Sequence, residues 1–173
     1  VEDPGFKDLY AYGVVAEVKQ VLRVSDELVK VLVEGKYRAK LLTLDSSGRF
    51  LLASTKAAAL RGTKSVDSAR VEALVRSVKE AFEEYLSLNP RLSKDVVYTI
   101  ITNEDAALLC DYIPANLLLK YTDKQALLNE GTVSGRLEKL LEILRRETKI
   151  LHIEKDIQSK VNEQMDKNQR DYY

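Results

Sequence analysis

The chain has 173 residues, with 27 basic and 27 acidic side chains and therefore a formal net charge of zero. This length allows one sizeable domain or two small ones, and 45% hydrophobic with 31% charged residues is typical of a soluble globular protein. The charge balance argues against a nucleic-acid binder, and the short apolar runs exclude a membrane span. The single cysteine, Cys110, excludes an intramolecular disulfide and favours a reducing, cytoplasmic setting.

The first third of the chain is predicted to begin with a β-hairpin. Residues 13–22 alternate between two faces, and residues 28–34 form a second run of β-formers. The polar stretch 24–27 between them is short enough for a hairpin turn. One face of the second run is predicted to carry Val29, Val31 and Val33.

The β pattern continues to about residue 60. Gly35 breaks this alternation, and residues 37–44 resume it. A strong turn signal at 45–48 precedes a last candidate strand at 50–60, which is weaker because alanine is a poor strand former. Short strands joined by tight turns favour a small barrel or a twisted meander over βαβ units.

From about Ser65 the period of the apolar residues changes from two residues to 3.6 residues, which predicts helices. The first ends at Asn89-Pro90; Ser93 is predicted to cap the second and Asn103 to start the third. Pro114 is expected to interrupt that region, and a fourth helix covers about 122–131. Three tyrosines among apolar residues are expected in the helical core: Tyr98, Tyr112 and Tyr121.

The last element is predicted to be one long helix from residue 132 to about 171. The span lacks proline, and its one glycine, Gly135, lies in the first turn. Such a helix is roughly 60 Å long at about 1.5 Å per residue. We expect its first half to pack on the preceding helices, and its more polar second half to project or to pair with another helix. The candidate seam for assembly consists of Leu144, Leu151, Ile157, Val161 and Met165.

Residues with catalytic chemistry are scarce. His152 lies in mid-helix and Cys110 among leucines, where a small core residue is the expected role. One histidine and one cysteine cannot form a zinc site. The segment 61–65 has the wrong glycine spacing for a phosphate-binding loop. We therefore predict no catalytic, metal-binding or cofactor-binding residue.

Similarity to a known family lies at both ends of the chain. Near the start stand Tyr12-Gly13-Val14-Val15-Ala16 and Val29-Lys30-Val31-Leu32-Val33-Glu34-Gly35, and near the end Leu151-His152-Ile153-Glu154-Lys155-Asp156-Ile157 and Lys167-Asn168-Gln169-Arg170-Asp171-Tyr172-Tyr173. In this order and at this distance they resemble the N-terminal region of bacterial ATP-dependent Lon proteases. Between residues 63 and 131 the resemblance is one of helical layout more than of motif.

The resemblance implies an α+β fold in three parts. An incomplete PUA-like β subdomain covers residues 1–62 and lacks the family's opening strands, a helical bundle covers 63–131, and the long helix covers 132–173. The second half of that helix is expected to project towards an ATPase module that is absent here. ATP and Mg belong to that module and the Ser-Lys dyad to an absent protease domain, so the chain is expected to hold no cofactor and no catalytic residue. Because the sequence starts Val1-Glu2-Asp3-Pro4 without methionine, we expect a piece of a longer polypeptide.

The function that the resemblance implies is non-catalytic substrate recognition and assembly in a protease that degrades misfolded and regulatory proteins. Its expected partners are unfolded or misfolded proteins and the other subunits of a Lon hexamer, with no nucleic acid and no membrane. The candidate substrate contacts crowd the first turn, although they could instead pack on the helices: Val21, Leu22, Val24 and Leu28. The family often has a Leu-Pro-Asp-Gly-like turn where this chain has Val24-Ser25-Asp26-Glu27. The alternatives are an RNA-binding PUA-type module and a stand-alone enzyme.

Overall fold

A computed structural model describes residues 3–62 and 68–172 of the chain. Within these residues a short 3-10 helix, η1 (Phe6–Asp8), is followed by three strands and then five α-helices, so the predicted α+β class is confirmed. The chain divides into two compact units: Val1–Arg61 with Leu128–Gly131, and Gly62–Leu127 with Thr132–Tyr173. The three-part division at residues 62 and 131 stays a prediction, and residues 63–65 of the segment 61–65 lie outside the described residues.

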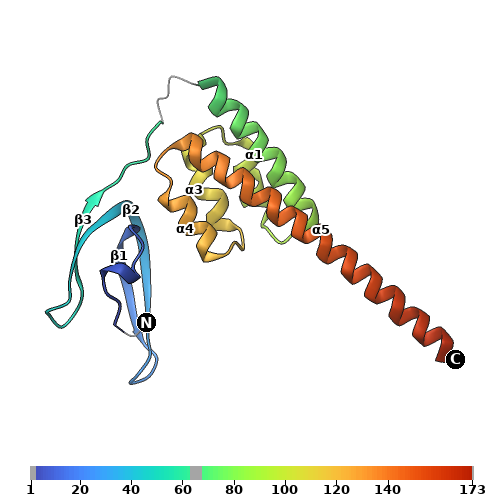
Figure 1. Cartoon of the computed structure of the whole chain (residues 1–173), viewed down its shortest axis with the longest axis horizontal. Helices are drawn as coiled ribbons and strands as arrows, with labels where there is room; N and C mark the ends of the chain where they lie inside the picture. Colours follow the sequence, from blue (N-terminus) through green and yellow to red (C-terminus); the bar gives the residue numbers. More distant parts are fainter. Residues whose placement is uncertain (1–2, 63–67, 173) are drawn as a thin grey trace. The chain divides into compact units, whose positions relative to one another are not determined.

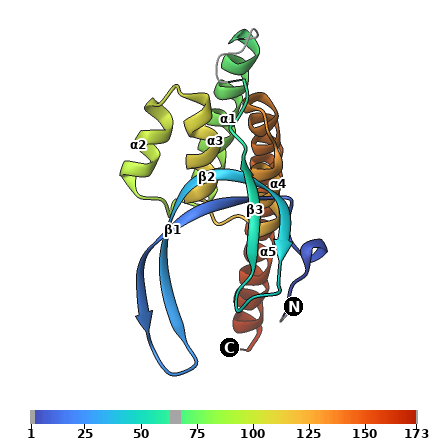
Figure 2. The same cartoon turned by 90° about the vertical axis from the view of Figure 1, so that its left-hand side faces the viewer.

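The strands form an antiparallel sheet in the order β1-β2-β3. Figure 2 shows β1 (Tyr12–Arg23) and β2 (Val29–Asp45) as one long hairpin, with β3 (Leu52–Ala57) on the other side of β2. The turn predicted between the first two strands is confirmed. The last strand is shorter than the predicted range of 50–60.

The predicted break in the alternation at Gly35 is confirmed as a shift of register, although the two runs form one strand, β2. Gly35 pairs with Ala16, and the next pair joins Val15 to Tyr37, so Lys36 is an extra residue in a β-bulge. Because the bulge adds one residue, the side chains before and after it alternate out of phase, which is the break that the sequence shows. A Cβ atom on Gly35 would lie 3.2 Å from Cγ1 of Val14, and this close approach favours glycine.

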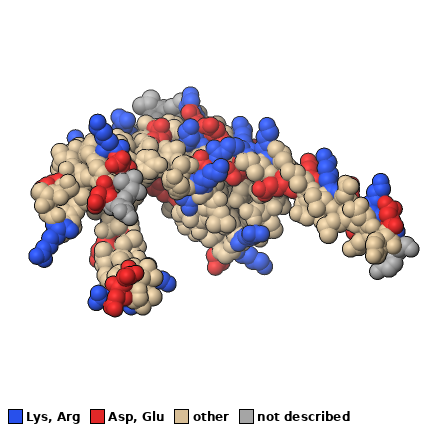
Figure 3. Space-filling view, turned by 60° about the horizontal axis from the view of Figure 1, so that its bottom comes forward, with Lys and Arg blue, Asp and Glu red and all other residues tan. Residues whose placement is uncertain are grey.

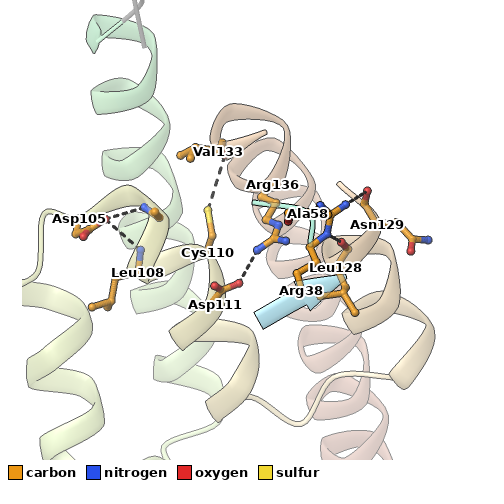
Figure 4. Close-up of polar contacts among 11 residues, drawn as sticks. Arg38, Ala58, Asp105, Leu108, Cys110, Asp111, Leu128, Asn129, Val133 and Arg136 are labelled. Carbon is orange, nitrogen blue, oxygen red and sulfur yellow. Dashed lines mark hydrogen bonds and ion pairs between the residues drawn. The ribbon is translucent and has the colours of Figure 1, made fainter. Parts of the chain in front are cut away.

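The helices are α1 (Ser68–Leu88), α2 (Lys94–Thr102), α3 (Ala106–Asn116), α4 (Tyr121–Asn129) and α5 (Val133–Tyr172). Ser93 caps α2 as predicted, since its Oγ accepts a hydrogen bond from the Val96 amide. The cap of α3 is Asp105 rather than Asn103: its Oδ1 accepts from the amides of Ala107 and Leu108 at 2.9 and 3.1 Å (Figure 4). A carboxylate suits this position because the helix N-terminus is positive.

Pro114 lies inside α3 and does not interrupt it. It removes one amide donor, that to the Cys110 carbonyl oxygen, but its ring is buried in the core and the helix continues to Asn116.

The helical unit has its core between α1, α3 and the first half of α5. Figure 1 shows α1 and that half of α5 side by side. Apolar side chains at helical spacing fill the space between them, and the following are at most 1% exposed: Val78, Phe82, Leu109, Ile113, Leu137, Leu140, Ile143 and Leu144.

The predicted placement of two tyrosines in this core is wrong. Tyr98 and Tyr121 are 70% and 75% exposed, and Tyr112 is half-buried. Among the tyrosines that the structure describes, the buried one is Tyr85 on α1, which is 5% exposed. Apolar neighbours in sequence do not imply a buried side chain, because successive residues of a helix point about 100° apart.

The second half of α5 extends beyond the other helices of its unit, as predicted (Figure 1). From Lys149 to Tyr172 every residue except the half-buried Leu151 is exposed. Figure 3 shows basic and acidic side chains interspersed along this part of the helix. Among the helices that the structure describes, none combines the length and apolar composition that crossing a bilayer requires.

Candidate functional site

The tip of the β1–β2 hairpin is a five-residue loop closed by backbone hydrogen bonds. The amides of Val24 and Ser25 both donate to the carbonyl oxygen of Leu28, at 2.9 and 3.2 Å. Inside the loop the Ser25 hydroxyl oxygen accepts from the amides of Glu27 and Leu28. The loop is therefore held by its own polar groups, although its sequence differs from the family's turn.

The four predicted contact residues are brought together around this loop, and all are exposed. Val21 is 59%, Leu22 52%, Val24 54% and Leu28 51% exposed. The alternative that they pack on the helices stays a prediction. Their role as substrate contacts stays a prediction.

One face of the hairpin is a continuous apolar surface, which we call the valine face: Val14, Val18, Val21, Val29, Val31 and Val33. Its members come from both strands, since Val18 pairs with Val33 and Val21 with Val31, and directly paired residues share a face. Each is between 49% and 59% exposed. Of the four predicted contacts, Val21 continues onto this face, whereas Leu22 lies on the opposite one.

The residues that β1 contributes to the valine face cannot be predicted from alternation in the sequence. Val18 and Val21 are three residues apart, which plain alternation assigns to opposite faces. The structure resolves this with a second bulge, because Val18 pairs with Val33 while Gln20 pairs with Leu32, leaving Lys19 as the extra residue. A bulge of this kind has no reliable signal in the sequence of one strand.

The opposite face of the hairpin carries a network of four charged residues. Lys19 Nζ lies 2.9 Å from Glu17 and 2.8 Å from Glu34, and Lys36 Nζ lies 2.8 and 3.1 Å from the same two carboxylates. Hydrogen bonds from both lysines lower the pKa of Glu17, with Lys36 having the larger effect. They also lower the pKa of Glu34, with Lys19 having the larger effect. Both extra residues of the bulges are thus lysines of this charged network, and nearer the tip the same face carries Leu22 and Leu32.

The predicted seam on α5 falls into two parts. Leu144 is fully buried in the helical core, and Leu151 is half-buried. Ile157, Val161 and Met165 are 57%, 46% and 57% exposed, and Ile150 and Ile153 extend this exposed stripe towards the core. The part of the seam that a partner helix can reach therefore begins near Ile150, and pairing along it stays a prediction.

The potentially reactive side chains do not converge. Burial raises the pKa of the Cys110 thiol to about 12, so the thiol stays protonated at neutral pH, and Sγ lies 3.8 Å from the Val133 carbonyl oxygen (Figure 4). This confirms Cys110 as a core residue. His152 is exposed, with Nε2 3.8 Å from Glu84 Oε1. Over residues 3–62 and 68–172, no three His, Cys, Asp or Glu side chains are grouped as metal ligands would be.

The profile of one protein family matches most of the chain. It is the substrate-binding domain of ATP-dependent protease La (LON), and the match covers residues 1–146. The chain belongs to this LON substrate-binding domain family.

Bacterial Lon proteases match over nearly the whole chain. The Lon protease of Escherichia coli (strain K12) is 38% identical over 172 residues, and that of Brucella melitensis is 40% identical over 172 residues. Lon protease 1 of Myxococcus xanthus is 39% identical over 171 residues. Each alignment covers 99% of this chain but only 21–22% of the relative. The chain thus spans about a fifth of the length of these LON relatives.

A solved structure shares the fold. The N-terminal domain of the Mycobacterium avium complex Lon protease superimposes with a TM-score of 0.62 at 22% sequence identity, covering 78% of this chain and 70% of that one. The predicted resemblance is therefore confirmed from sequence and from fold, and these matches favour the LON prediction over the RNA-binding alternative.

Proposed function

We propose that this chain is the non-catalytic substrate-recognition and assembly region of an ATP-dependent Lon protease that degrades misfolded and regulatory proteins. Its partners are unfolded or misfolded proteins and the other subunits of a Lon hexamer, in the cytoplasm. ATP hydrolysis and peptide-bond cleavage by a Ser-Lys dyad take place elsewhere in the parent protein. The family match and the three Lon proteases named above support this role.

The observation that carries substrate recognition is the exposed apolar surface of the hairpin. Unfolded chains differ from folded ones in their exposed apolar side chains, and a contiguous apolar patch is where such side chains can be buried. The valine face and the tip offer this surface on a twisted two-stranded ribbon. The ion pairs of Glu17, Lys19, Glu34 and Lys36 make part of the other face charged. Nearer the tip that face adds the exposed side chains of Leu22 and Leu32 to the apolar surface.

Assembly is proposed to use the exposed stripe on α5. Ile157, Val161 and Met165 follow one another at intervals of four residues and are about half exposed, so they can pack against an equivalent helix of another subunit. The projecting half of α5 also sets a fixed distance between the helical core and the residues that follow it.

The substrate-recognition test is photo-crosslinking of the 173-residue chain to a permanently unfolded protein, with a folded protein as the non-substrate. We expect selective crosslinks to the unfolded protein that map to the hairpin. The variant Val21→Ser/Leu22→Ser/Val24→Ser is expected to lose most of them, with circular dichroism confirming that it folds. A matched control, Phe50→Ser/Leu51→Ser, removes exposed apolar surface elsewhere in the β unit. Equal crosslinking by both variants and the wild type contradicts the hairpin as the site.

The assembly test is analytical ultracentrifugation over a wide concentration range. We expect self-association that Val161→Glu abolishes, because it places a charge within the apolar stripe. Ser159→Glu adds the same charge on the far side of the helix and is expected to leave association unchanged. A wild-type chain that stays monomeric at high concentration contradicts pairing through α5.

A further inference from the structure

The helical unit contains a cavity that neither the hairpin nor the α5 stripe involves. It has a volume of about 260 Å³ and lies where α1 and α3 end, between the segment 85–92 and the segment 116–118. The volume is below the roughly 300–1,000 Å³ typical of small-molecule sites. It suits a single amino-acid side chain together with its backbone groups.

The apolar part of the cavity is made by three leucines. Leu117 is 3% exposed and Leu92 is half-buried, whereas Leu118 is 82% exposed although it is part of the lining. A leucine this exposed beside a partly apolar cavity gives up contact with water when a ligand covers it. The apolar part therefore favours an aliphatic or aromatic side chain.

The polar part of the cavity offers a positive charge and hydrogen-bonding groups to the terminal carboxylate and amide of a peptide. Arg91 is the one charged residue among the lining residues that the structure describes, its side chain is exposed and no ion pair engages it. The Tyr85 hydroxyl accepts a hydrogen bond from Asn89 Nδ2 at 3.2 Å and keeps its own proton available for donation. Asn116 Nδ2 donates to the Tyr112 carbonyl oxygen, which leaves Oδ1 of Asn116 to accept from an amide.

Two helix C-termini border the cavity, and Arg91 is the lining residue that offsets their partial negative charge. Helix C-termini carry partial negative charge on their free carbonyl groups. Here the Asn89 amide donates to the carbonyl oxygens of Tyr85 and Leu86, and Asn116 donates to that of Tyr112. These bonds occupy two of the last four carbonyls of α1 and none of the last four of α3, so binding of an anion here depends on the guanidinium of Arg91.

We propose that this cavity binds the C-terminal residue of a polypeptide, an apolar side chain with a free α-carboxylate. The leucines bury the side chain, Arg91 and the Tyr85 hydroxyl bind the carboxylate, and Asn116 accepts from the terminal amide. This rests on the proposed function in that the polypeptide is a substrate of the protease, but the cavity is a different site from the hairpin.

The test measures fluorescence anisotropy of an N-terminally labelled peptide that ends in leucine, bound to the full 173-residue chain. The comparison peptide differs only in having a C-terminal amide. We expect amidation to weaken binding about tenfold, as the loss of a charge-assisted hydrogen bond does. Arg91→Gln is expected to bind both peptides with the weaker affinity. Arg145→Gln, which removes an exposed arginine elsewhere in the helical unit, is expected to preserve the difference.

Several outcomes overturn the proposal. Equal affinity of the wild type for acid and amide, no binding of the acid, or an unchanged difference in Arg91→Gln each removes the role of the cavity. The hairpin variant Val21→Ser/Leu22→Ser/Val24→Ser separates the two sites, since it should keep the difference between acid and amide. If the wild type crosslinks unfolded protein but does not distinguish the peptides, the cavity proposal fails alone. If it distinguishes the peptides but crosslinks no unfolded protein, the hairpin proposal fails alone.

Discussion

Arg38 binds three backbone carbonyl oxygens within the β unit. Its Nε donates to Leu128 at 2.5 Å, and its two terminal nitrogens donate to Ala58 and Asn129 at 3.1 and 3.0 Å (Figure 4). The guanidinium carbon also lies 3.9 Å from the ring centroid of Tyr12. One side chain thus fixes the segment 128–131 to β2 and to the residue after β3.

Arg38→Lys should destabilise the β unit by about 2 kcal/mol, because a single ammonium cannot reach three divergent carbonyls and leaves partly buried acceptors unsatisfied. Urea denaturation followed by circular dichroism measures the loss. Arg49→Lys makes the same exchange at an exposed position and should cost less than about 0.5 kcal/mol. Equal stability of the two variants would show that the Arg38 hydrogen bonds contribute nothing.

Cys110 makes the stability of the helical unit depend on alkaline pH. Its pKa rises from 9.0 to about 12 on folding, mainly through burial. Below pH 9 both the folded and the unfolded chain keep the proton, so the contribution is fully present. Between pH 9 and about 12 only the unfolded chain releases it, and stability falls as pH rises.

The free energy of unfolding should therefore fall more steeply in the wild type than in Cys110→Ala above pH 9, by up to roughly 1.4 kcal/mol per pH unit. The difference between the two denaturation series from pH 8 to 10.5 isolates the thiol from the titrating lysines and tyrosines. Parallel series would mean that the thiol ionises as easily in the folded chain as in the unfolded one.

At the scale of elements, α5 is one helix with two environments. Leu144 is fully buried against the other helices, whereas Ile157, thirteen positions later, is 57% exposed. Both belong to the same apolar pattern in the sequence. What separates them is the extent of the other helices, which end before the second half of α5 begins.

Leu144→Ala should cost about 3 kcal/mol, since it leaves a cavity in a packed core. Ile157→Ala on the same helix should cost less than about 0.5 kcal/mol at protein concentrations where the chain is monomeric. Thermal or urea denaturation of both variants checks the contrast. A large loss in Ile157→Ala would mean that the projecting half is covered within the monomer.

Signals confined to one element were predictable from the sequence. The hairpin turn, the cap at Ser93 and the extent of α5 each depend on local chemistry, and each is confirmed. The bulges at Lys19 and Lys36 were not, because they depend on how two strands pair. Asn103 and Asp105 are both good caps, but Asn103 ends α2, its amide donating to the Thr99 carbonyl oxygen, and Asp105 begins α3.

The clustering of Val21 and Val24 was predictable, because both lie next to the turn in the sequence. The valine face needed the register of both strands, and the cavity near Arg91 needed two loops that are distant in sequence. Pro114 was misleading because a proline removes only one amide hydrogen bond of a helix, and the sequence does not show that its ring is buried in the core.

At the scale of the whole molecule, burial is unevenly divided between the two units. Among the described residues of the β unit, Ala39 alone is a buried apolar residue, whereas sixteen lie in the helical unit. Since burial of apolar surface is the main source of stability, the two units should open with different free energies.

Hydrogen exchange should accordingly protect α1 and the first half of α5 most. Amides of β1 and β2 should exchange at least about tenfold faster than those around Phe82 and Leu140, because they open without disturbing the helical core. Mass spectrometry of exchanged, digested chain gives the comparison directly. Equal protection of strands and helices would show that the sheet is stabilised by contacts beyond those of its own unit.

The two environments of α5 also have a mechanical consequence. The buried stretch from Val133 to Thr148 is about 24 Å long, and the exposed stretch from Lys149 to Tyr172 is about 36 Å. A rod clamped over its shorter part and free over its longer part is a cantilever, in which a small rotation at the clamp becomes a larger sweep at the tip. A load applied at the tip acts on the clamp with the same leverage. The packing of Leu137, Leu140 and Leu144 against the neighbouring helices is therefore what resists bending moments along α5.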